Sequence, residues 1–435
     1  MRFLRIALLC AVPIACTELA TAPGACPTFC PNATIESRDT IFTDIIVRDS
    51  SFRGYVQGYQ AEAMTAADLA GVIDSRAFFV LNNMSTRTTY RAGDTTTVPI
   101  VPDSARLRTI IVRRDTLATN LRLNLYRLPV TADSNDTFAS LDPYFNSPPV
   151  DSVNISAVLA RPPVTDTATR RIWGDSIWTD SAGHVITLAE NNRTLVLYWH
   201  LDTLQAPLVE ADSGSLAFGV RVAADSLATI AIGTLESARN AQLTWYYHYT
   251  VPDTVTAEPD SVKSGSAPRA PRFDSFVFDR PAAPLDENLV VGGVPSARSL
   301  LRVDWPDFLR DSIDVVRATL ILVPVGPVLA SPADSFEVRG LPVTTDVGAK
   351  SPIALTFQGL AMIHPQTSDT VRMELTDLVR SWALDSTLTT AFMLGQVPEA
   401  ASYTEIRFYS SRAPALRPAL HVTYVKRCRK RTKRR

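Results

Sequence analysis

The regular alternation of apolar and polar residues restricts the fold of this chain more than any other feature. In "LRLNLYRL", Leu121, Leu123 and Leu125 fall on one face, opposite Arg122 and Asn124. A period of two is typical of a strand with one buried face. The same alternation recurs in runs separated by Pro, Asp, Ser and Gly turns, at residues 76–81, 193–201, 216–222, 315–323, 404–409 and 420–424. The sequence therefore predicts an all-β protein.

One segment has a helical period instead. Leu375, Leu378, Val379 and Trp382 lie at positions i, i+3, i+4 and i+7. This spacing predicts one or two helical turns that pack against a sheet and bury Trp382.

The first residues have the features of an export signal. Arg2 and Arg5 precede an apolar run over residues 6–15, which is too short to span a bilayer. We therefore expect a signal peptide over residues 1–22, followed by a spacer over residues 23–35, in an exported protein.

Two cleavage sites compete in this leader. Ile14-Ala15-Cys16 resembles a lipoprotein box, in which a lipidated Cys16 would anchor the protein to the outer membrane or cell surface. Ala20-Thr21-Ala22 offers a site for ordinary secretion. Both routes stay open at this point.

The opposite end of the chain is strongly basic. The formal net charge is only −1, but "KRCRKRTKRR" at residues 426–435 holds eight of the 43 basic residues. Like charges at this density predict a disordered tail, which would attract envelope polyanions or have no partner at all. The sequence indicates no specific nucleic-acid recognition.

A duplication is indicated within the chain, whose 435 residues exceed one ordinary core. Residues 251–272 are rich in Pro and Ser, lack an apolar period and predict a linker. On either side, "SRAFFVL" and "SLLRVD" match, as do "LRLNLYRLPV" and "SFEVRGLPV" and the closing strands "LTWYYHYT" and "LHVTYV". We infer two copies, at residues 36–250, enlarged by insertions, and at residues 273–425.

The second copy resembles a known domain family. "RSLLRVDWPDFLRDSIDVVRATLILVPV", "VRMELTDLVRSWALDSTLTTAFMLG" and "EIRFYSSRAPALRPALHVTYV" are similar to the signature blocks of DNRLRE-type domains. These are jelly rolls of bacterial secreted proteins that are similar to carbohydrate-binding modules. The resemblance covers residues 273–425 and extends to residues 36–250 through the repeat. It implies two tandem jelly-roll-like β-sandwich domains joined by a Pro/Ser-rich linker.

A sugar site needs an exposed aromatic ring beside polar side chains. Candidate rings are Trp305, Tyr403 and Tyr409 in the second copy and Trp173, Trp178 and Tyr246 in the first. Packing in the sandwich is the alternative for each of them. Asp286, Glu287 and Asn288 could supply oxygens to a structural calcium ion, or form a plain acidic turn.

The sequence carries no motif for catalysis. The five histidines are isolated, and no metal-ligand, nucleophile-elbow, phosphate-loop or dinucleotide pattern is present. We expect no enzyme and no cofactor, but a surface protein that binds polysaccharide or serves in the cell envelope. The alternatives are a purely structural or adhesion component without a glycan site and, third, a glycoside-active enzyme with a carboxylate pair.

Overall fold

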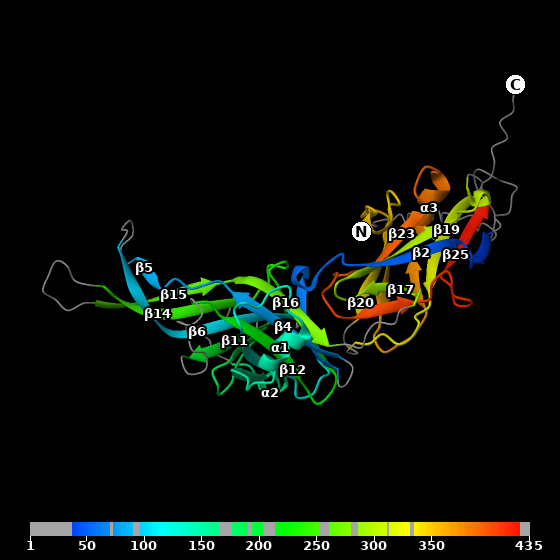
Figure 1. Cartoon of the computed structure of the whole chain (residues 1–435). Helices are drawn as coiled ribbons and strands as arrows, with labels where there is room; N and C mark the ends of the chain where they lie inside the picture. The colour runs from blue at the N-terminus through cyan, green and yellow to red at the C-terminus, as the bar shows by residue number, and fades with distance from the viewer. Residues whose placement is uncertain are drawn as a thin grey trace, which may run out of the picture.

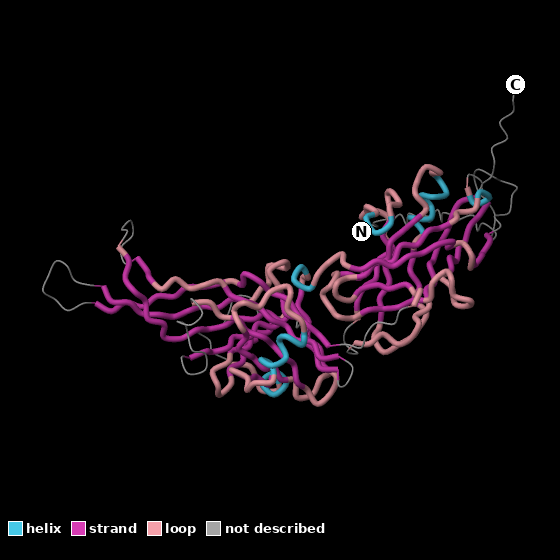
Figure 2. The backbone as a smooth tube through the Cα atoms, in the orientation of Figure 1, coloured by secondary structure: helices cyan, strands magenta, loops and turns pink. Residues whose placement is uncertain are grey.

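The computed structural model describes residues 37–69, 73–89, 96–164, 176–189, 194–202, 214–251, 261–279, 286–310, 313–330 and 335–426. Within these ranges most regular structure is β, which confirms the all-β sandwich class predicted from the alternation. The strands form two lobes that lie side by side (Figure 1). Figure 2 shows that the helices are few and short.

The first lobe is built on the first repeat. Its strands are β3 (Ala63–Leu69), β4 (Ile73–Leu81), β5 (Arg87–Thr89), β6 (Thr97–Arg114), β7 (Arg122–Leu128), β8 (Asp151–Asn154), β9 (Ser176–Thr179), β10 (Val185–Leu188), β11 (Leu195–Asp202), β12 (Ala217–Ala223), β13 (Ala228–Gly233) and β14 (Gln242–Val251). In the sequence, helix α1 (Phe138–Phe145) lies between β7 and β8, and helix α2 (Ile155–Leu159) lies between β8 and β9. The strand order is β8-β7-β12-β4-β3-β13-β6-β11-β10-β9, and β14 also pairs with β6.

The second lobe is built on the second repeat. Its strands are β17 (Leu289–Gly292), β18 (Ala297–Val303), β19 (Ile313–Leu322), β20 (Phe336–Pro342), β21 (Gly359–Ile363), β22 (Val371–Glu374), β23 (Ala391–Val397), β24 (Glu405–Phe408) and β25 (Ala419–Lys426). Helix α3 (Thr376–Leu384) buries Trp382, as the helical period predicts. The order β21-β20-β23-β18-β17-β24 repeats the order β8-β7-β12-β4-β3-β13, and β19 pairs with β25 and β22 as β6 pairs with β14 and β11. This shared topology is what a duplication produces.

Four strands are exchanged between the repeats. Strands β1 (Ser37–Phe42) and β2 (Ile46–Arg53) lie at the start of the predicted first copy, yet they pair with β25 and β18 of the second lobe. Strands β15 (Ser261–Arg269) and β16 (Pro271–Asp279) lie in the predicted linker and at the start of the second copy, yet they pair with β14 and β4 of the first lobe. We call residues 37–53 the first arm and residues 261–279 the second arm. In Figure 1 the blue β2 lies among the yellow-to-red strands of the second lobe.

The exchange corrects the predicted domain boundaries and the linker. Residues 261–272 are not a linker, because they form β15 and the start of β16; residues 252–260 lie outside the described ranges. Residues 37–53 belong to the second lobe, and residues 273–279 belong to the first. The two sandwiches are therefore not joined simply in tandem. Alternation identifies a strand but not the sheet that it joins.

Strand β15 lacks an apolar pattern because its neighbour provides the apolar surface. Gly265 lies opposite Tyr247 of β14. A Cβ atom at Gly265 would lie 2.7 Å from Cζ of the Tyr247 ring, so the ring covers the glycine backbone. A strand of Ser, Lys and Gly can pair in this way at a sheet edge without apolar side chains of its own.

Each arm contributes to the core of the lobe that it joins. In the second lobe, Ile46 of the first arm is buried with Trp305 and Trp382. In the first lobe, Phe276 of the second arm is buried with Trp199. Each lobe therefore needs the arm of the other repeat for its packing as well as for its sheet edge.

A loop of the second lobe joins the two lobes. Thr65 of β3 donates a hydrogen bond from Oγ1 to the carbonyl oxygen of Ala401 at 2.6 Å. Tyr403 is 1% exposed and packs with Leu69 and Ile73 of the first lobe. The contact therefore combines a buried hydrogen bond with apolar packing.

We predict that a substitution in one arm destabilises the opposite repeat. Ile46→Ala should accelerate backbone amide exchange in β18 and leave β4 unchanged, because the loss of a buried Ile side chain costs about 2–5 kcal/mol. Phe276→Ala should accelerate amide exchange in β4 and leave β18 unchanged. Hydrogen exchange measured by mass spectrometry distinguishes the two lobes, and destabilisation of each arm's own repeat would show that the arms are not exchanged.

Asp274 of the second arm is a buried carboxyl group with a raised pKa. Its side chain is 2% exposed and accepts a hydrogen bond from the backbone nitrogen of Leu235 at 3.0 Å. Burial outweighs this bond and raises the pKa of Asp274 from 3.8 to about 7. The folded state therefore binds the proton more tightly than the unfolded state, and the stability that depends on Asp274 falls as the pH rises from about 4 to about 7.

Asp274→Asn should consequently stabilise the protein at alkaline pH. The amide oxygen can still accept the hydrogen bond from Leu235, and no charge is buried, so we expect a gain of about 2–4 kcal/mol in the free energy of unfolding at pH 8. The gain should shrink as the pH falls from 7 towards 4. Urea unfolding at pH 8 and pH 5 measures it, and an equal gain at both pH values would contradict the raised pKa.

Candidate functional site

One layer of the first lobe presents a polar and aromatic outer face, formed by β11, β6, β14 and β15. The alternation turns Leu107, Trp199 and Trp245 into the core, where all three are fully buried. The side chains between them point outward. We call this surface the tyrosine face, and its members are Ser104, Arg106, Arg108, Tyr198, His200, Gln242, Thr244, Tyr246, His248, Ser264 and Ser266.

The strand registers arrange the tyrosine face in rows. Tyr246 lies between Ser104 and Ser266. In the next row, Arg106 is flanked by His200 and Thr244, and beyond it Arg108 is flanked by Tyr198 and Gln242. Neighbouring strands lie about 4.8 Å apart, and residues two apart along a strand are separated by about 7 Å. The face is therefore a regular grid of donors and rings on a rigid sheet.

Both tyrosines of the tyrosine face are at least partly exposed. Tyr246 is 41% exposed, and Tyr198 is half-buried with the Arg106 guanidinium 4.2 Å from the centre of its ring. The ring and the guanidinium together form a flat, partly apolar surface.

A register shift opposite Tyr246 and Tyr247 leaves Asp103 as an extra residue in β6. Its carboxylate Oδ1 lies 2.6 Å from Nδ1 of His248, and this contact fixes the imidazole at the edge of the face. Bulges commonly redirect side chains at sheet edges in this way.

This arrangement suits the recognition of a sugar chain. The apolar face of a pyranose can stack on an exposed tyrosine ring, while Arg, His, Thr and Ser side chains hydrogen-bond its hydroxyl groups. The grid contains such donors on four adjacent strands, β11, β6, β14 and β15.

The aromatic residues selected in the second copy lie elsewhere. Trp305 is 3% exposed and packs against Trp382, and Tyr403 is 1% exposed in the contact between the lobes. Neither ring presents a face to a sugar, because Trp305 packs in the core of the sandwich and Tyr403 packs between the two lobes. Tyr409 is half-buried beyond the end of β24.

Of the candidates in the first copy, the structure places Tyr246 on the exposed grid. Trp178 is 8% exposed and donates from Nε1 to the carbonyl oxygen of Arg161 at 2.8 Å. Trp173, Cys16 and the tail beyond residue 426 lie outside the described residues. Sequence reasoning missed Tyr198 and its arginine neighbours, although their outward positions in the alternating runs could have identified them.

The acidic turn proposed for calcium is occupied by guanidinium groups. Asp286 is ion-paired with Arg407, and Glu287 contacts Arg412 at 2.7 Å. Asn288 donates its backbone N–H to Asp286 at 3.0 Å. Among the described residues, no group of three His, Cys, Asp or Glu side chains could hold a metal ion.

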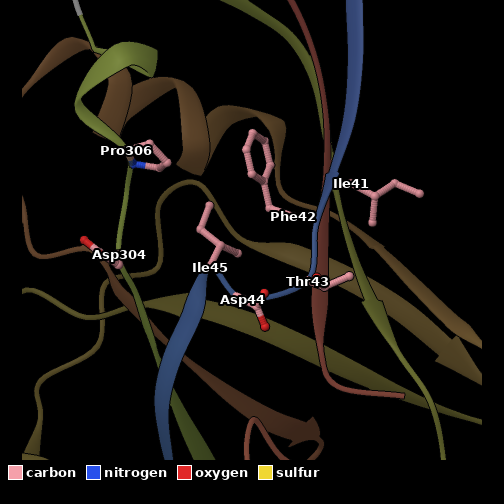
Figure 3. Close-up of a pocket in the computed structure, with 7 residues that line it drawn as sticks. All are labelled: Ile41, Phe42, Thr43, Asp44, Ile45, Asp304 and Pro306. Carbon is pink, nitrogen blue, oxygen red and sulfur yellow. The ribbon is translucent and has the colours of Figure 1, made fainter. Parts of the chain in front are cut away.

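A shallow pocket of about 370 Å³ lies at the turn between β1 and β2. Phe42, Ile45, Pro306, Asp44 and Asp304 are among the residues that line it, and Figure 3 shows the Ile41 side chain pointing away from Phe42 and Ile45. The Asp44 carboxylate is 2.9 Å from Arg417. Ile45 belongs to the core of the second lobe. The pocket therefore lies on the outer side of the β1–β2 turn, which anchors the first arm.

Comparisons with known proteins assign no family. No family model and no curated protein matches the chain. Among solved structures, the N-terminal CBM22-1-CBM22-2 tandem domain of Xyn10C from Paenibacillus barcinonensis is similar at 7% identity, over 88% of this chain and 99% of that chain, with a TM-score of 0.14. A TM-score this low carries no argument about fold or ligand. No helix among the described residues has the length and apolar character needed to cross a membrane.

His184 supports the edge of the layer that carries Tyr198. Its Nδ1 lies 2.6 Å from Asp180, its Nε2 lies 2.7 Å from Asp151, and its ring packs edge-on against Trp199. Burial opposes the charged ring, but the two hydrogen bonds and the two negative charges outweigh burial, so the pKa of His184 is raised. The imidazolium therefore ties β8 to the β9–β10 hairpin.

We predict that His184→Gln lowers the free energy of unfolding by about 2 kcal/mol at pH 6, because one charge-assisted hydrogen bond and the positive charge are lost. The stabilisation by His184 is complete below its usual pKa of about 6.5 and is lost as the pH rises through the raised value. The difference between wild type and variant should therefore shrink between pH 6 and pH 9 in urea titrations. A constant difference would mean that folding does not raise the pKa of His184.

Proposed function

We propose that the protein is a non-catalytic polysaccharide-binding protein of the cell surface and that the tyrosine face is its binding site. The observation that carries this proposal is the pair of outward tyrosines, Tyr198 and Tyr246, among hydroxyl and guanidinium donors on the outer side of one layer. A purely structural component has no need for a grid of donors and rings on its surface. Rigid strands also hold such a grid more firmly than loops do.

The proposal includes export by the leader, anchoring through a lipid on Cys16 and membership of the DNRLRE-type domains. These points rest on the sequence features described above. The second repeat would then act as a spacer that holds the tyrosine face away from the envelope.

Tyr246→Ala tests this function. The variant should weaken binding to a recognised polysaccharide about 3- to 10-fold, because an aromatic contact is worth about 0.5–1.5 kcal/mol beyond its buried area. Tyr144→Ala is the matched control, since Tyr144 is 42% exposed but lies on α1, outside the tyrosine face. Affinity electrophoresis in gels that contain a panel of neutral and acidic polysaccharides measures both. Unretarded migration of the wild type in every gel would overturn the proposal.

A further inference from the structure

The duplication provides an internal comparison for the tyrosine face. The first and second repeats can be aligned through their strand pairing, because β6 and β19 have an extra residue, Asp103 and Val316, at the same place opposite the closing strand. Identical inward residues occupy four aligned pairs of positions: Ala105 and Ala318, Leu107 and Leu320, Leu243 and Leu420, and Tyr247 and Tyr424.

The outward positions differ between the repeats. Where the first repeat has two tyrosines and two arginines, the second has no tyrosine and one arginine: Tyr246 aligns with Thr423, Tyr198 with Arg372, Arg106 with Thr319, and Arg108 with Ile321. The core residues are shared because both sandwiches pack alike, whereas nothing in the packing requires the outward differences. The character of the tyrosine face is therefore specific to the first repeat.

The charges of the two faces differ in the same way. On the second repeat, Arg317 is 2.9 Å from Glu374 and His421 is 2.6 Å from Asp39, so each of these two side chains contacts a carboxylate. On the tyrosine face, no described carboxylate pairs with Arg106.

Arg108 is likewise without an ion pair among the described residues, and its Nε is buried with no hydrogen-bond partner. Asp103, the carboxylate nearest in register to this face among the described side chains, is bound to His248. Arg106 and Arg108 thus lie two residues apart on β6, about 7 Å along the strand, and neither has an ion pair with the described part of the chain.

We propose that the ligand of the tyrosine face is an anionic polysaccharide, whose carboxylate or sulfate groups bind Arg106 and Arg108 while its sugar rings stack on Tyr246 and Tyr198. This inference rests on the proposed function and specifies its ligand class. A guanidinium forms two parallel hydrogen bonds with a carboxylate or sulfate, which a neutral hydroxyl group cannot match. A nucleic acid is disfavoured, because its dense phosphates require many basic contacts, whereas this face offers two arginines.

The test compares acidic polymers with neutral polymers of the same backbone. Polygalacturonate is paired with its methyl ester, and dextran sulfate is paired with dextran, so that the carboxylate and sulfate sources are separated. The full chain should bind at least one acidic member about tenfold more tightly than its neutral partner at low salt. Added salt should reduce this preference.

The double variant Arg106→Gln/Arg108→Gln should lose most of the preference for the acidic polymer, whereas binding to the neutral partner should weaken much less, because the Gln amides can still hydrogen-bond hydroxyl groups. Arg317→Gln/Arg372→Gln removes the same charge from the aligned face of the second repeat and should behave as wild type. Thermal melts of both variants check that the fold is intact.

Each outcome separates the two proposals. Equal binding to acidic and neutral partners, unaffected by Arg106→Gln/Arg108→Gln, would overturn the anionic ligand and leave polysaccharide binding intact. Equal losses in both double variants would assign the preference to net charge and overturn the site. Absence of binding to every polysaccharide would overturn both proposals. Tighter binding of a single-stranded oligo(dT) that depends on Arg106 and Arg108 would assign the face to nucleic acid instead.

Discussion

The pairing of each arm with the opposite repeat is the constraint on which the rest of the structure depends. β2 follows the whole length of β18, and β16 follows β4, so each lobe has an edge closed by a strand from elsewhere in the chain. Removing an arm would leave a row of backbone groups on the neighbouring strand unpaired. It would also remove a buried side chain from the core, Ile46 from the second lobe or Phe276 from the first. The two lobes consequently cannot separate without the loss of strands from each.

Sequence periodicity predicted the strands well because alternation reports directly which side chains are buried. Leu121, Leu123 and Leu125 are all at most 1% exposed, and α3 buries Trp382 as its spacing predicts. Periodicity could not predict the partner of a strand, since pairing is made by backbone groups that every residue carries. The sequence alone therefore places each arm with its neighbours in the chain, and β15 resembles a linker because it has no apolar period, with Gly265 opposite the Tyr247 ring.

The candidate site was predicted only in part for a related reason. Aromatic residues occur both in cores and on binding surfaces. In a strand, only the residue's position in the alternation shows whether its ring is buried or exposed. Trp305 and Tyr403 were chosen by residue type and are buried, whereas Tyr246 lies outward between the inward Trp245 and Tyr247. The aligned positions of the two repeats make the same distinction more sharply, since identity is confined to the inward side where packing demands it, and the outward side is free to diverge.

The exchange also makes the tyrosine face composite. β15 comes from the second arm, and it places Ser264 and Ser266 beside His248 and Tyr246 of the first repeat. A ligand that contacts these serines binds only while the second arm is docked, so its binding free energy adds to the stability of the docked arm. Because β16 continues from β15 after one residue and pairs with β4, that stabilisation extends to the edge of the first lobe. Ligand binding and arm exchange are in this way coupled through a single strand, without any movement of the sheet.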